Sequence, residues 1–241
     1  RRPPRSTLFP YTTLFRSSRV LMGGKAVGLV ADAVYAFPTA RPRIAAIGGM
    51  DQGMGGFLRI VDQGIAGLPP FDRQAGAEAY AAFKPGLVIL KAGLRSGVGG
   101  RLEALGIRTE YVSLESPMEW YADLAALGRV FGAEERAGQL IAYYQDTVKR
   151  VAQAADEAVA ARKGVKPRVL LIQATGDGFE VPPDAWMQSL LVGMAGGEPV
   201  WKGSTPGSGW TKIGTEQIAA WDPEVLIVVS DTQSAPALAE K

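Results

Sequence analysis

Cysteine and histidine are both absent from the 241 residues of this chain. Without them it has no disulfide, no thiolate nucleophile and no Ser-His triad. Imidazole ligands for zinc, manganese or haem iron are excluded in the same way. A hydrolase or a direct binder of first-row metal ions would therefore depend on carboxylates, lysines and hydroxyls alone.

Long hydrophobic runs are also missing. A membrane-spanning helix needs about 18 or more largely apolar residues, and the best stretch, Ala26–Phe37, is short and contains Asp32. The sequence therefore predicts no membrane-spanning helix. Hydrophobic residues still make up 47% of the chain, which is enough for the cores of one large or two small α/β domains.

The first seventeen residues, Arg1–Ser17, have four arginines, no acid and no apolar periodicity. Their order resembles one translated frame of a widely used sequencing adapter, so we interpret them as a non-native leader and exclude them from the fold. We expect the native targeting signal to be missing for the same reason. Without the leader, basic residues fall from 26 to 22 against 24 acidic ones, and the formal net charge changes from +2 to −2. No basic surface for nucleic acid is predicted.

Short apolar runs bounded by Gly, Pro or polar residues alternate with helical patterns along the chain. This alternation is typical of α/β folds with parallel strands. The predicted buried strands are Val20–Met22, Ile44–Ile47, Leu87–Leu90, Val169–Ile172 and Val225–Val229. The predicted helices between them are Ala26–Phe37, Gly76–Phe83, Gly100–Leu105, Pro117–Phe131 and Ala185–Met194.

Two helices in the middle of the chain have clear signals. Ser116, Pro117 and Glu119 predict an N-cap, a first-turn proline and a capping-box acid, and Gly132 predicts the end of that helix. Apolar residues then recur at steps of three and four, which predicts one helix of about 45 Å over 133–162.

One segment of the chain is echoed later in the sequence. Gly76–Leu90 (GAEAYAAFKPGLVIL) aligns without gaps with Gly214–Val228 (GTEQIAAWDPEVLIV). Each copy predicts a short helix, a Pro-containing turn and a buried strand. Helix-Pro-strand is common in α/β proteins, but the long helix between the copies favours two similar lobes joined by a rigid spacer.

The chain contains, in this order, the opening RVLMGG, the stretch AEAYAAFKPGLVILK, and the later segments KPRVLLI, LVGMAGGEPVW and GWTKIGTEQIAAWDPEVLIVV. This ordered set resembles the periplasmic binding proteins of ABC importers for siderophores, haem and vitamin B12. The resemblance implies an α/β fold with two lobes of parallel sheet flanked by helices, joined by one long helix, with the ligand in the cleft between them. It divides the chain into an N-terminal lobe (18–131), the inter-lobe helix (132–163) and a C-terminal lobe (164–241). Gly86 stands where the family usually has Asp, and family members continue beyond the position of Lys241, so we expect the second lobe to be incomplete.

The resemblance also assigns roles to particular residues. Glu78 and Glu216, at matching positions of the echo, are expected to dock against arginines of the membrane permease; the alternative is two ordinary solvated glutamates favoured by the helix dipole. Ligand contacts are expected from loops at the carboxyl ends of the strands. The candidate ligand-binding residues are Lys25, Met50, Met54, Lys91, Arg95, Phe179, Lys202 and Trp210.

The expected function is capture of an iron-siderophore complex or a corrinoid and its delivery to a permease dimer in the inner membrane, driven by the partner ATPase. No catalytic residue, resident metal or cofactor is expected, and the protein is expected to be a monomer, periplasmic or lipid-anchored outside the cytoplasmic membrane. Two alternatives stay open. The Gly-rich runs Gly93–Gly100 and Thr175–Gly178 leave a Rossmann-like nucleotide-binding enzyme possible, although neither has the Walker spacing. A metal-ion binding protein of related architecture is the other, disfavoured by the lack of histidine.

Overall fold

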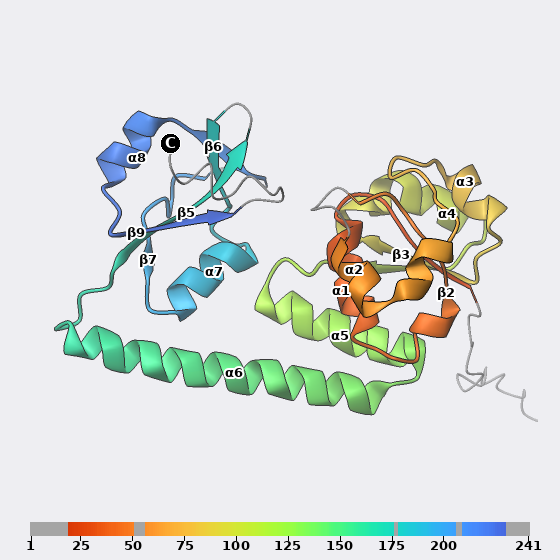
Figure 1. The fold of residues 1–241 in the computed structure, drawn as a ribbon, viewed down its shortest axis with the longest axis horizontal. Coiled ribbons are helices and arrows are strands. Elements are labelled where there is room, and N and C mark those ends of the chain that lie inside the picture. Colours follow the sequence, from red (N-terminus) through yellow and green to blue (C-terminus); the bar gives the residue numbers. More distant parts are fainter. Residues whose placement is uncertain (1–18, 51–55, 176–177, 206–208, 230–241) are drawn as a thin grey trace, which may run out of the picture.

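The computed structural model describes residues 19–50, 56–175, 178–205 and 209–229. These residues form two α/β lobes that lie side by side along one long helix (Figure 1). The strands and helices predicted from hydrophobic periodicity are all present, with ends that differ by a few residues.

The first lobe is built on a four-stranded sheet in which every pairing is parallel, in the order β2-β1-β3-β4. Side chains of neighbouring residues in β1 and β3 enter two different hydrophobic clusters, one on each face of the sheet. Burial on both faces explains why these strands are continuous apolar runs in the sequence. The elements of this lobe are β1 (Val20–Met22), α1 (Val27–Tyr35), β2 (Ile44–Ile47), α2 (Gly56–Val61), α3 (Ala77–Ala82), β3 (Leu87–Lys91), α4 (Gly100–Ala104), β4 (Thr109–Val112) and α5 (Pro117–Phe131), with short turns η1 (Arg41–Arg43), η2 (Gln63–Gly67), η3 (Ala92–Leu94) and η4 (Arg95–Gly99).

The second lobe has a mixed sheet, which differs from the wholly parallel sheet expected. Strand β5 pairs in parallel with β7 and β9, but β6 runs antiparallel to both β5 and β8. Its core surrounds Trp201, whose indole Nε1–H donates to the Pro182 carbonyl at 2.9 Å. The elements of this lobe are β5 (Arg168–Thr175), β6 (Gly178–Val181), α7 (Met187–Met194), β7 (Glu198–Pro199), β8 (Thr211–Ile213), α8 (Thr215–Trp221) and β9 (Val225–Val229).

The capping signals of α5 are confirmed. Ser116 has extended backbone angles, its hydroxyl accepts the Glu119 N–H at 3.3 Å, and the Glu119 carboxylate accepts the Ser116 hydroxyl at 2.9 Å. Gly132 ends the helix in the left-handed region, at φ 63°. The bond from the Glu119 N–H satisfies a backbone group that a helix start otherwise leaves unpaired, and the side-chain bond holds the Ser116 hydroxyl in place.

The long helix α6 (Glu134–Ala161) contacts both lobes. Its 28 residues span about 42 Å at 1.5 Å per residue. Near its start Ala137 packs against Gly128 of α5, so closely that a Cβ on that glycine would lie 2.6 Å from the Ala137 Cβ. Near its end Ala155 and Val159 lie against Gly196 of the second lobe, at 3.0 and 3.4 Å from the position of a Cβ there. A single helix therefore braces the two lobes (Figure 1).

Candidate functional site

Glu78 and Glu216 lie in the first turns of α3 and α8, one in each lobe, and both side chains are exposed. Each helix begins after an extended glycine, Gly76 or Gly214, and each carboxylate turns back toward that glycine. A Cβ on Gly76 would lie 3.0 Å from Glu78 Oε2, and one on Gly214 would lie 2.8 Å from Glu216 Oε2. The two lobes therefore present their glutamates in the same local geometry.

The match continues beyond the glutamates. Lys84 and Asp222, at corresponding positions before the proline of each copy, both adopt the left-handed conformation, with φ 48° and 42°. Strands β3 and β9 begin at corresponding residues of the echo. Helices α3 and α8 both lie on the side of the molecule away from α6 (Figure 1). The sequence echo is thus a structural repeat, and it gives each lobe one exposed carboxylate in the first turn of the repeated helix.

The strand-end residues of the first lobe differ in what they offer a ligand. Lys25, after β1, is exposed. Met50, after β2, is partly buried and packs against the hydrophobic core of its own lobe. Met54 lies outside the described residues. Only Lys25 among these three has a described side chain that is open to solvent.

Lys91 does not behave as the free cation that we expected at the end of β3. Its side chain is 11% exposed, and its ammonium donates to the carboxylate of Glu115 at 2.6 Å and to the carbonyl of Ser113. A buried ammonium is tolerated when its donors are paired in this way. These internal partners argue against a direct ligand contact by Lys91.

Arg95 is exposed, and its guanidinium lies over the ring of Tyr111 at 4.2 Å from the centroid. The Tyr111 hydroxyl donates to Glu103 at 2.9 Å. Burial, with this bond to the carboxylate, raises the pKa of Tyr111, whereas the nearby Arg95 lowers it. A stacked guanidinium loses little freedom on binding, so Arg95 is a fixed positive group suited to an anionic ligand.

Trp210 and Trp186 form an aromatic pair in the second lobe, with ring centroids 6.2 Å apart and planes at 85°. Both rings are partly buried, and Trp210 packs against the lobe core together with Phe179 of β6. Sequence reasoning predicted Trp210 and Phe179 but missed Trp186, which directly precedes α7. The only signal for it was an aromatic residue at a helix start.

Lys202 lies in a different place from the one expected. It lines a cavity of about 510 Å³ together with Arg168 and Glu224, which stand at the amino ends of β5 and β9. Ligand-binding loops of parallel sheets lie at the opposite, carboxyl ends. Lys202 therefore lies beside the amino end of β5 rather than at the carboxyl ends where ligand contacts were expected, because the two-residue β7 pairs only with the first residues of β5.

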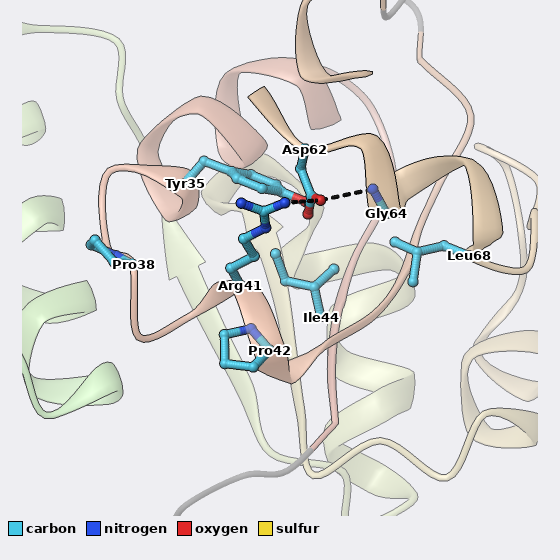
Figure 2. Close-up of a pocket in the computed structure, with 8 residues that line it drawn as sticks. All are labelled: Tyr35, Pro38, Arg41, Pro42, Ile44, Asp62, Gly64 and Leu68. Carbon is cyan, nitrogen blue, oxygen red and sulfur yellow. Dashed lines mark hydrogen bonds and ion pairs between the residues drawn. The ribbon is translucent and has the colours of Figure 1, made fainter. Parts of the chain in front are cut away.

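A second cavity, of about 410 Å³, lies in the first lobe beneath Asp62 (Figure 2). The Asp62 carboxylate accepts hydrogen bonds from the Arg41 guanidinium at 2.5 Å, the Gly64 N–H at 2.9 Å and the Tyr35 hydroxyl at 3.0 Å. Burial, together with the bond to Asp62, raises the pKa of Tyr35. Each of these donors bonds to the Asp62 carboxylate, so the cluster joins α1, η1 and η2 and stabilises the fold.

Among the described residues, no helix is long and apolar enough to cross a membrane. The same ranges contain no group of three or more Asp or Glu side chains arranged to hold a metal ion.

Comparison with known proteins gives a consistent picture. A family profile described as periplasmic binding protein matches residues 69–241. No curated protein matches the chain.

Several solved structures share its fold. A periplasmic haem-binding protein from Pseudomonas aeruginosa superposes with a TM-score of 0.68 at 22% identity, over 89% of this chain and 72% of that one. A TroA-like periplasmic binding protein from Veillonella parvula gives a TM-score of 0.69 at 19% identity, over 88% and 64%. The periplasmic vitamin B12 binding protein of Vibrio cholerae gives 0.66 at 12% identity, over 92% and 79%.

Proposed function

The chain belongs to the periplasmic binding protein family, and from this premise we propose that it is the substrate-binding component of an ABC importer that captures an iron-siderophore complex or a corrinoid between its lobes. It delivers this ligand to a permease dimer served by an ATPase. The protein acts outside the cytoplasmic membrane, in the periplasm or held by a lipid anchor, and as a monomer. It performs no chemistry on the ligand.

The observation that supports delivery to a permease is the matched pair of helix starts. A permease dimer offers two similar surfaces related by two-fold symmetry. Glu78 and Glu216 offer two similar exposed carboxylates, one on each lobe. Arginines facing such carboxylates steer association and set orientation more than they add affinity. The repeat therefore fits a partner that contacts both lobes in the same way.

The described strand-end residues fit a large chelate that has both charge and apolar surface. Lys25 and Arg95 supply exposed positive groups in the first lobe. Trp186 and Trp210 supply flat apolar surface in the second, and aromatic rings bind such ligands at small entropic cost. The chain has no histidine or cysteine to ligate the metal, so we expect recognition to rest mainly on the organic shell and the charge of the chelate.

Titration calorimetry of the purified chain with a ferric hydroxamate, a ferric catecholate, haemin and cyanocobalamin tests the ligand class. We expect saturable binding of one of these chelates and none of ATP or NAD. Saturable nucleotide binding without chelate binding would favour the nucleotide-binding enzyme instead and overturn the proposal.

The docking role has a separate test in cells that express the cognate permease. Reversing both charges (Glu78→Lys with Glu216→Lys) is expected to abolish uptake and to leave chelate affinity within about twofold, because like charges then face the permease arginines. Glu157→Lys, an exposed position on α6, is the matched control and should leave uptake unchanged. Uptake that survives the double reversal would show that these carboxylates do not dock.

A further inference from the structure

The segment Ser113–Ser116, between β4 and α5, is held in one conformation from its own lobe. The Asp123 carboxylate of α5 accepts the N–H groups of Ser113 and Leu114 at 2.7 and 2.8 Å. Leu114 adopts the left-handed region at φ 58°, which an L-residue rarely does, and its side chain is only 2% exposed. A strained residue persists only where surrounding contacts determine it. The segment is therefore a rigid part of the first lobe.

Lys91, at the end of β3, holds the same segment through two further hydrogen bonds. Its ammonium donates to the Ser113 carbonyl and, at 2.6 Å, to the Glu115 carboxylate. The lysine is the last residue of β3, a strand that is fully buried. The bonds thus join the central sheet to Glu115, whose side chain is 36% exposed.

Glu115 in turn contacts the second lobe. Its backbone carbonyl accepts the N–H of Met187, the first residue of α7, at 2.6 Å. Within residues 19–50, 56–175, 178–205 and 209–229 this is the one hydrogen bond that joins the two lobes. In Figure 1 the first turns of α5 and α7 accordingly face each other in the space between the lobes, beside α6.

The donor at Met187 is one of the four N–H groups that a helix start leaves without a partner inside the helix. Such groups are usually satisfied by a capping side chain, but the residue before α7 is Trp186, which provides no such bond. The first lobe therefore supplies the acceptor that the second lobe lacks. Helix α7 is capped across the gap between the lobes.

From this arrangement we propose that Lys91 is a positioning residue that sets the separation of the two lobes, by holding the Glu115 carbonyl where it caps α7. The chain of contacts runs from β3 through the lysine and Ser113–Ser116 to Met187. Loss of the ammonium removes the bonds that hold Glu115 and so weakens the hydrogen bond from Met187 to the Glu115 carbonyl. For the docking role, which rests on the proposed function, the same contact also sets the spacing of Glu78 and Glu216. The test of the Lys91 contact itself needs neither ligand nor permease.

Because the chain has no cysteine, spin labels can be placed at two chosen sites. Ala104→Cys in α4 and Gln217→Cys in α8 are exposed, and neither belongs to the contact. In this double-cysteine background Lys91→Met, which keeps an apolar stem but no charge, is expected to broaden the distance distribution measured by double electron-electron resonance. The Met187 amide should exchange with solvent about tenfold faster, the ratio that corresponds to loss of one hydrogen bond.

Two control variants accompany Lys91→Met. Glu115→Gln retains an acceptor for Lys91 and should stay within about twofold of the parent in both measurements. Arg150→Met, which breaks an exposed ion pair on α6, should change neither. If Lys91→Met does not fold by circular dichroism, Glu115→Ala serves in its place and should shift both measurements in the same direction. An unchanged distance distribution and unchanged Met187 exchange in a folded Lys91→Met or Glu115→Ala protein would overturn the proposal. Failure of every chelate to bind would contradict the proposed function and leave the proposal about Lys91 unaffected.

Discussion

Asp62 provides a quantitative test of how the first lobe is held together, because one carboxylate joins three segments there (Figure 2). Asp62→Ala removes the acceptor for Arg41, for the Gly64 N–H and for Tyr35. The Arg41 side chain is 53% exposed, so solvent screens its ion pair to about 1 kcal/mol or less. The cap to Gly64 contributes about 1 kcal/mol, and the partly buried Tyr35 hydrogen bond about 1 more. We therefore expect a loss of about 2–3 kcal/mol in the free energy of unfolding.

The contribution of Asp62 also depends on pH. Burial by itself would raise the pKa of this carboxyl, but the hydrogen bonds from Arg41, Gly64 and Tyr35 outweigh burial and hold the pKa below its ordinary value. Because the folded pKa is lower than the unfolded one, this stability is present above about pH 4 and is lost as the pH falls through the folded pKa. Asp62→Asn cannot titrate, so its stability should fall less steeply in acid.

Urea unfolding followed by circular dichroism at pH 7 and at pH 3 measures both effects. Asp146→Ala is the matched control, since its carboxylate pairs with Arg150 at 3.1 Å on the open surface of α6 and both side chains are more than half exposed. Such a pair contributes well under 1 kcal/mol. The reasoning fails if Asp62→Ala loses no more stability at pH 7 than Asp146→Ala, or if Asp62→Asn shows the same acid dependence as the parent.

Three further outcomes follow from the structure. Trp210→Ala should weaken chelate binding by about 1–3 kcal/mol in calorimetry, while Trp210→Phe keeps a ring beside Trp186 and should lose less; equal affinity in all three proteins would return Trp210 to a packing role alone. Tyr80→Phe should leave stability at pH 7 unchanged or slightly higher, because the buried Tyr80 hydroxyl has no hydrogen-bond partner in the described part of the chain. Burial raises the pKa of Tyr80 to about 12, above that of the unfolded chain, so ionisation of this hydroxyl leaves the parent's stability unaffected below about pH 10 and lowers it as the pH rises toward 12. Tyr80→Phe lacks this ionisation, so its stability should fall less steeply in alkali. Gly196→Ala should cost about 1–2 kcal/mol in thermal unfolding, since φ is +83° and a Cβ would press on Ala155 at 3.0 Å; an unchanged melting temperature would show that α6 can move aside there.

The parts of the fold that follow from local chemistry were predictable. Five apolar runs gave five strands, although the first three residues of β9 are exposed where a buried strand was expected. The Ser116–Glu119 capping box and Gly132 marked both ends of α5. The gapless echo predicted the matched helix starts, because glycine, glutamate and proline at fixed spacing impose the same turn twice.

Other features depend on contacts that no local pattern records. Strands β6 and β8 have few residues and pair antiparallel, so neither length nor periodicity distinguishes them from loops. A lysine at the end of a strand, such as Lys91, predicts a ligand contact from the sequence alone. The sequence does not show that Glu115 pairs with it, because this pairing depends on the left-handed turn at Leu114. The position of Lys202 beside the amino end of β5 could not be predicted, because the two-residue β7 is too short to show in the sequence.

The twin strands of the repeat are buried very differently, and this difference affects how the molecule unfolds. Strand β3 is fully covered, whereas Val225, Leu226 and Ile227 of β9 are 43%, 51% and 39% exposed. The described core of the second lobe is correspondingly small beside the two clusters of the first. Because the described residues of the two lobes are joined by one helix and one hydrogen bond rather than by a common core, we expect the lobes to form separate cooperative units. Heating should therefore give two transitions, with the second lobe melting first and a calorimetric enthalpy larger than the van't Hoff value.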